Sequence, residues 1–264
     1  MINLTTPADD LLIEHRDEVL LITLNRPQAS NALSGSLCRA LTHLLAQVSD
    51  EPEVRAVVLS GGNGNVFCAG ADLKERLANP GKDFEMRRPI LALWRALGTF
   101  AKPLVYAING HALGGGFELV VHADAAIASS AAEFALPEVQ WAGIPGGWAT
   151  QMLPRLVGPT RARWLMLSGE RLSAAQAERF GIVTEVVAPE QVLQRAFAVA
   201  AMLGARPAAA VAAVKEAVRF SLDVPLTAGV EVEDRLLQIA TASPERIQRL
   251  AAFASGARPD RKEN

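Results

Sequence analysis

Cysteine, excess positive charge and long apolar runs are what this 264-residue chain has least of. Its two cysteines, Cys38 and Cys68, are too few for a disulfide framework, so we expect a reducing compartment, the cytoplasm. Lysine and arginine number 26 against 28 acidic residues, which gives a formal net charge of −2. That balance supplies no long-range field for a nucleic-acid partner. No apolar run approaches the roughly 18 residues of a membrane span, and the first ten residues carry no targeting pattern, so we predict no membrane partner.

Motifs for nucleotides and metals are missing as well. Neither G-x-x-x-x-G-K-[ST] nor G-x-G-x-x-G occurs, which argues against nucleoside triphosphates and dinucleotides. The four histidines and two cysteines show no metal-ligand spacing, so we predict no metal and no separate cofactor. Cys68 has no recognisable base and is expected to be a small core residue.

Half of the residues are apolar, enough for one large core or a core with a helical appendage. Periodicity predicts a hairpin over 11–15 and 19–24, a helix behind a Ser34 cap, a strand over 54–60, a helix over 84–100 and a strand over 104–108. Beyond residue 181, alanine-rich helices are predicted over 190–203, 207–220, 226–241 and 244–254. The sequence therefore predicts an α/β core over 1–195 and a helical region over 196–264.

The stretch from Asn109 to Gly147 is the most informative. The strand over 104–108 is expected to lead through a glycine loop, 114–116, into a helix that carries Glu118, and a second carboxylate, Glu138, follows Pro137. Free N–H groups at a helix start favour negative charge, so donors beside two carboxylates make an acid/base site. Taken alone, the glycines could merely allow tight packing, and Glu138 could be a solvated loop carboxylate.

Six motifs occur in order along the chain: N-R-P-Q-A-S-N-A-L (25–33), F-C-A-G-A-D-L-K-E (67–75), K-P-L-V-Y-A-I-N-G-H-A-L-G-G-G-F-E-L (102–119), F-A-L-P-E-V-Q-W-A-G-I-P-G-G (134–147), L-P-R-L-V-G (153–158) and the run over 167–183. With them the chain resembles the enoyl-CoA hydratase/isomerase (crotonase) superfamily over nearly its whole length. The resemblance implies an α/β fold in which repeated ββα units wind into a spiral, with a helical C-terminal region. It also implies a homo-oligomer, a trimer or a dimer of trimers.

The resemblance also implies roles for particular residues. The oxyanion hole falls on the backbone N–H groups of Ala71 and Gly115, with Glu118 as ionised base and Glu138 as protonated acid. We base the first assignment on the helix N-terminus near Glu118, which favours its anion. Further positions are expected to contact the acyl-CoA substrate: Arg26, Ala69, Gly70, Asp72, Lys74, Gly114, Pro137, Gly146 and Trp148.

The reaction implied is reversible hydration of a 2-enoyl-CoA to a 3-hydroxyacyl-CoA, a step of fatty acid and lipid metabolism. Keeping both glutamates favours it over the alternatives, an isomerase or another acyl-CoA dehydratase or lyase, and a non-catalytic RNA-binding member. Three departures from the family pattern stand out: Leu136 before Pro137, Gly146-Gly147-Trp148 in place of G-x-G-G, and no basic residue directly before Arg258. If Trp148 faces the acyl pocket, its size would restrict the substrate tail.

Overall fold

The computed structural model describes residue 4 and residues 9–255, and these divide into two compact units, Met1–Leu203 and Gly204–Asn264. The predicted boundary between residues 195 and 196 lies within helix α8 (Val192–Gly204), whereas the division between the two units falls between Leu203 and Gly204. The departure from the family pattern before Arg258 lies outside the described residues.

The larger sheet of the first unit has six strands in the order β1-β2-β3-β5-β7-β10. β1 and β2 form the predicted antiparallel hairpin, and the other neighbours are parallel. Every residue of β3, β5 and β7 is buried, as expected for parallel strands covered on both faces. The strands span Leu11–Arg16, Val19–Leu24, Ala56–Ser60, Leu104–Ile108, Ala125–Ser129 and Glu185–Val187, in chain order.

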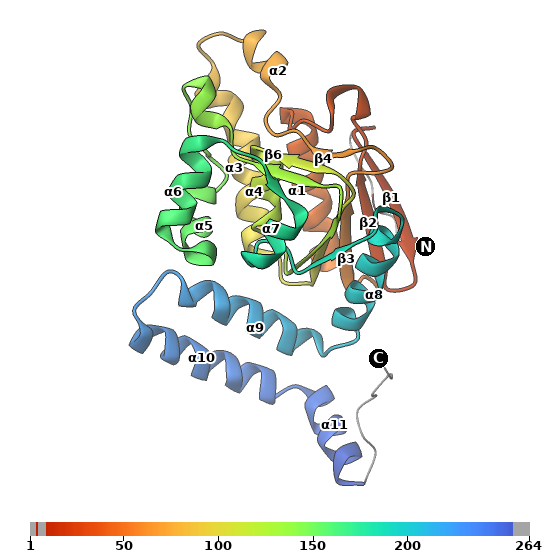
Figure 1. The fold of residues 1–264 in the computed structure, drawn as a ribbon. Coiled ribbons are helices and arrows are strands. Elements are labelled where there is room, and N and C mark those ends of the chain that lie inside the picture. The colour runs from red at the N-terminus through yellow and green to blue at the C-terminus, as the bar shows by residue number, and fades with distance from the viewer. Residues whose placement is uncertain (1–3, 5–8, 256–264) are drawn as a thin grey trace. The chain divides into compact units, whose positions relative to one another are not determined.

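A smaller sheet joins four short strands in the order β4-β6-β8-β9: Val66–Cys68, His111–Leu113, Glu133–Ala135 and Leu172–Ser173. Figure 1 shows β4 and β6 side by side. In each pair β3–β4, β5–β6 and β7–β8, the first strand joins the larger sheet and the second joins the smaller one. The chain thus winds repeatedly between two sheets, which confirms the predicted spiral of ββα units.

One local prediction was wrong. The sequence suggested that the strand over 104–108 leads through a glycine loop directly into the next helix, but β6 lies between them. Three residues are too few to show a reliable period, and β6 exists because β4 and β8 flank it.

Helices fill the remaining connections of the first unit. The predicted cap of α1 is confirmed, because Ser34 Oγ accepts from the backbone N–H of Leu37 at 3.2 Å. α7 begins with a capping box between Ser173 and Gln176. The α-helices are α1 Gly35–Asp50, α2 Leu73–Leu77, α3 Asp83–Thr99, α4 Gly115–Val120, α5 Ala149–Val157, α6 Pro159–Ser168, α7 Ala174–Arg179 and α8; the 3₁₀ turns are η1 Pro27–Ala29, η2 Glu138–Trp141 and η3 Pro189–Gln191.

The second unit contains α9 (Ala208–Ser221), α10 (Leu226–Thr241) and α11 (Pro244–Ala254), close to the predicted bounds. Figure 1 shows α9 and α10 running side by side. No residue of these three helices is buried among those described. Across the part of the chain that the structure describes, no single helix is long and apolar enough to cross a membrane; only the pair Pro189–Gly204 and Ala208–Ser221, counted together, has the length and composition.

Candidate active site

The glycine triplet sets the start of α4 against the smaller sheet. Gly114 has φ +52°, a conformation that side chains rarely adopt, and its N–H donates to the Ala135 carbonyl at 2.8 Å. A Cβ at Gly116 would lie 2.0 Å from the Cys68 carbonyl oxygen, so only glycine lets the helix approach β4 this closely. The tight packing considered from the sequence is therefore real, and the residues at the start of α4 are buried.

Two backbone N–H groups come together at this start. A Cβ at Gly70 would lie 3.0 Å from the Gly115 nitrogen, and a Cβ at Gly115 would lie 3.6 Å from the Ala71 nitrogen. Within the described residues, neither the Ala71 nor the Gly115 N–H donates to a backbone carbonyl. Two neighbouring unpaired donors suit an oxygen that becomes negatively charged during a reaction.

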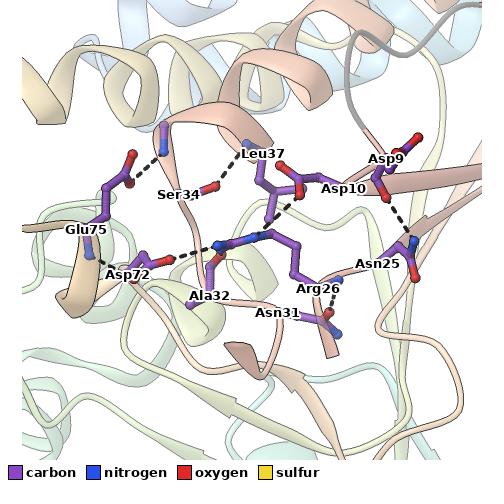
Figure 2. Close-up of polar contacts among 11 residues, drawn as sticks. Asp9, Asp10, Asn25, Arg26, Asn31, Ala32, Ser34, Leu37, Asp72 and Glu75 are labelled. Carbon is purple, nitrogen blue, oxygen red and sulfur yellow. Dashed lines mark hydrogen bonds and ion pairs between the residues drawn. The ribbon is translucent and has the colours of Figure 1, made fainter. Parts of the chain in front are cut away.

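Arg26 fastens the loop that carries Ala71. Its guanidinium lies between Asp72, at 2.9 Å, and Asp10, at 3.5 Å, and donates to the Ala32 carbonyl at 2.5 Å (Figure 2). Asp72 in turn caps α2 by accepting from the Glu75 N–H at 3.1 Å. The sequence suggested Arg26 as a contact for CoA phosphates, but its guanidinium is committed to protein groups. We therefore assign Arg26 and Asp72 to holding the loop that carries Ala71.

Glu118 lies one turn into α4 with only 4% of its surface exposed. Its Oε1 accepts from the backbone N–H groups of Gly147, at 2.5 Å, and Ala149, at 3.3 Å. Burial raises the pKa of Glu118, whereas these N–H groups, that of Gly146 and the charge of Arg87 oppose the rise. Both of these hydrogen bonds go to Oε1, which fixes the orientation of the carboxyl group.

Glu138 begins η2 directly after Pro137. Its Oε1 lies 3.0 Å from where a Cβ of Gly114 would be, which places the carboxyl beside the two N–H donors. Its Oε2 is buried without a hydrogen-bond partner in the described structure. Burial, with a smaller contribution from the charge of Glu118, raises the pKa of Glu138 to about 7.

The two carboxyl groups therefore differ in the state that their surroundings favour. Glu118 receives backbone N–H groups that stabilise its anion, whereas Glu138 has a buried oxygen without a donor, which favours its neutral form. The reason given from the sequence, the helix N-terminus, needs correction. The donors to Glu118 come from the turn over 146–149, which sequence reasoning missed although the G-I-P-G-G motif marks it.

The other predicted contacts lie at different places. Gly146 lies beside Arg87, whose guanidinium would be 2.9 Å from a Cβ at that position. The ring of Trp148 lies against Gly98 of α3 and contacts His122 at 5.1 Å between ring centroids. Lys74 is exposed on α2, and its contact with CoA remains a prediction.

Cys68 does not take part as a nucleophile in this arrangement. It is fully buried in the core, and burial raises the pKa of its thiol to about 12, so the thiolate is absent at neutral pH. No group of three histidine, cysteine or acidic side chains is placed to hold a metal ion within the described ranges.

The fold and site define a class before any relative is considered: a ββα spiral that gathers two backbone N–H donors and two carboxyl groups whose pKa values are raised by burial. Residues 14–263 match the family model described as enoyl-CoA hydratase/isomerase. The chain belongs to the enoyl-CoA hydratase/isomerase family, and it is an enzyme of that family.

The names of individual relatives are consistent with this family. The chain is 40% identical over 249 residues to a probable enoyl-CoA hydratase of Rhizobium meliloti (strain 1021), covering 94% of this chain and 95% of the relative. It is 36% identical over 253 residues to the 2,3-dehydroadipyl-CoA hydratase of Escherichia coli (strain K12), covering 96% and 98%. The crystal structure of an enoyl-CoA hydratase from Bacillus anthracis superposes with a TM-score of 0.91 at 33% identity, covering 97% of this chain and 100% of the other.

Proposed function

We propose that this enzyme hydrates a 2-enoyl-CoA reversibly to the 3-hydroxyacyl-CoA by syn addition of water. The observation that carries the proposal is that Glu118, whose Oε1 accepts a backbone N–H, and Glu138, whose pKa burial raises to about 7, lie near enough to interact, with the carboxyl of Glu138 beside the start of α4. Water addition needs a base and an acid at once, and this pair supplies both at neutral pH.

In the proposed reaction the thioester oxygen accepts hydrogen bonds from the backbone N–H groups of Ala71 and Gly115. Glu118 removes a proton from water as the water oxygen bonds to Cβ, and the π electrons move to the thioester oxygen as an enolate. Glu138 then gives its proton to Cα, and the proton on Glu118 returns to Glu138 through solvent. The two N–H groups stabilise the enolate, and losing one such donor typically costs about 10²–10³ in rate.

The substrate is the only source of CoA, and no separate cofactor or metal enters the proposed reaction. Ala69, Gly70, Gly114 and Pro137 lie next to the groups that act on the thioester and are proposed to contact it, with Lys74 as the candidate cation for a CoA phosphate. The proposed setting is fatty acid metabolism in the cytoplasm.

The proposed assembly is a trimer or a dimer of trimers. The second unit supports it, because α9, α10 and α11 expose large apolar side chains: Val214, Val218, Leu226, Val230, Leu237, Ile239, Ile247, Leu250 and Phe253. Faces of this kind commonly mark an interface. Light scattering at micromolar concentration should give the mass of three or six chains, and a monomer would contradict the proposed assembly.

The function is tested with a panel of 2-enoyl-CoAs that includes short, long and branched tails. The E. coli relative's name adds a dicarboxylic member, 2,3-dehydroadipyl-CoA. Hydration is followed by loss of the absorbance of the conjugated thioester. Turnover of 3-enoyl-CoAs to 2-enoyl-CoAs without hydration would instead support the isomerase reading. If no thioester reacts, a salt-dependent gel shift with RNA tests the remaining alternative, which the net charge of −2 disfavours.

A further inference from the structure

The orientation of Glu118 depends on the turn over 146–149. Glu118 sits on α4, but the groups that bind its Oε1 are the N–H groups of Gly147 and Ala149. A Cβ at Gly147 would lie 2.8 Å from Glu118 Oε2 and 2.5 Å from the Trp94 ring, so the turn touches the carboxylate closely. A shift of this turn would move these donors relative to the carboxylate, because Glu118 is carried by α4.

His122 contacts the same turn from its other side. Its Nε2 lies 3.3 Å from the Gly147 carbonyl oxygen, and because a carbonyl can only accept, the hydrogen bond requires a proton on Nε2. Burial lowers the pKa of His122 to about 4, so the ring is neutral at physiological pH and carries one N–H. Gly147 is therefore bound on both sides, through its N–H to Glu118 and through its carbonyl to His122.

Two tryptophans fix the imidazole ring in this place. Trp94 of α3 stacks on His122 with 5.4 Å between centroids and 8° between planes, and Trp148 contacts it at 5.1 Å and 53°. Trp148 has φ +77°, a strained conformation for a large residue, and a Cβ at Gly98 would lie 2.6 Å from its ring. The position where the chain departs from the G-x-G-G pattern is thus the one that packs on His122.

We infer that His122 is a positioning residue for the proposed hydration, because its Nε2–H holds the Gly147 carbonyl and so keeps the Gly147 N–H on Glu118 Oε1. This inference rests on the proposed function for its kinetic part. The charged groups that act on Glu118 in the described structure are Arg87 of α3 and Glu138 of η2, and His122 contacts the turn whose N–H groups bind Glu118.

The central variant is His122→Phe, which keeps a flat ring between the tryptophans and removes the N–H. With the Gly147 N–H less well placed, the anion of Glu118 loses stabilisation, so its titration midpoint should rise and the acid limb of kcat/KM should move to higher pH. Misplacement of a reacting group by 1 Å can cost about 10²-fold, and we expect a smaller loss, about tenfold in kcat with little change in KM. His122→Gln, which restores a donor near the Nε2 position, should recover much of the rate.

The matched control is His43→Phe, the same substitution at an exposed histidine of α1. Thermal unfolding of all three variants separates packing from positioning, since loss of stability alone would not move the titration of Glu118. Carbon-13 NMR of labelled glutamate, assigned with Glu118→Gln, follows that titration without any substrate. An unchanged Glu118 midpoint in His122→Phe would overturn the inference. Absence of hydration by the wild-type enzyme would instead overturn the proposed function, and the NMR titration would still decide the role of His122.

Discussion

The hydration rate should depend on pH, because Glu138 must be protonated in order to give its proton to Cα. A carboxyl at the ordinary value near 4.3 would be protonated in only about one molecule in 500 at pH 7. With its pKa raised by burial to about 7, Glu138 is protonated in about nine-tenths of molecules at pH 6 and about one-tenth at pH 8. Hydration that needs the protonated form should therefore slow about tenfold between these pH values. At lower pH, protonation of Glu118 removes the base and limits the rate from the other side.

A second reaction tests Glu138 in its ionised form, so its rate should change with pH in the opposite direction to that of hydration. Exchange of the α-proton of a saturated acyl-CoA with deuterated solvent needs an ionised base at Cα and the oxyanion donors, but no attacking water. If Glu138 faces Cα, exchange should rise as pH passes through about 7, where hydration falls. The neighbouring charge of Glu118 contributes to the raised pKa, so Glu118→Gln should retain exchange with a midpoint at lower pH.

The assays are initial rates of crotonyl-CoA hydration by absorbance and of exchange in butyryl-CoA by proton NMR, each from pH 5 to 9. Glu138→Gln serves as the control and should lose both reactions. A hydration rate that stays constant between pH 6 and 8, or an exchange rate that falls over that interval, would refute the assignment of Glu138 as the acid.

The remaining predictions concern single residues of the site and its frame. Glu118→Gln and Glu138→Gln should each lower kcat by about 10²–10⁴ with little change in KM, measured by steady-state hydration, because each loses proton transfer and keeps its shape; near wild-type turnover in Glu118→Gln would leave only a single-base reaction. Ala71→Pro removes one oxyanion donor, so turnover should collapse while calorimetry still detects acyl-CoA binding; unchanged turnover would remove Ala71 from the site. Gly116→Ala should destabilise the protein by about 1–3 kcal/mol in urea unfolding, since its Cβ would lie 2.0 Å from a carbonyl oxygen of β4. The control Gly64→Ala should not, because the nearest neighbour of its Cβ would lie at 3.9 Å. Equal stability of the two variants would contradict this packing argument.

Long periodic segments and ordered motifs were readable from the sequence. The hairpin of β1 and β2, the Ser34 cap and the C-terminal helices follow from local spacing and capping chemistry, which act over a few residues. Local periodicity could not show the spiral fold, because winding between two sheets produces no repeat in the sequence. The spiral was predicted from the order of the motifs, which identified the family. The short strands β4, β6 and β8 were not readable, since each is stabilised by neighbours distant in sequence.

Only the tertiary structure decided how the site residues are held. From the sequence Arg26 was a candidate cation for CoA phosphates. Its ion pairs with Asp10 and with Asp72, which is 46 positions further along the chain, exist because the fold brings these residues into contact. In the same way, the anion of Glu118 is stabilised by a turn 29 residues further along the chain, not by its own helix. The sequence gives the identity of each residue but not its surroundings. Burial and hydrogen-bond partners set the pKa of a carboxyl group, and they arise only when distant segments pack together.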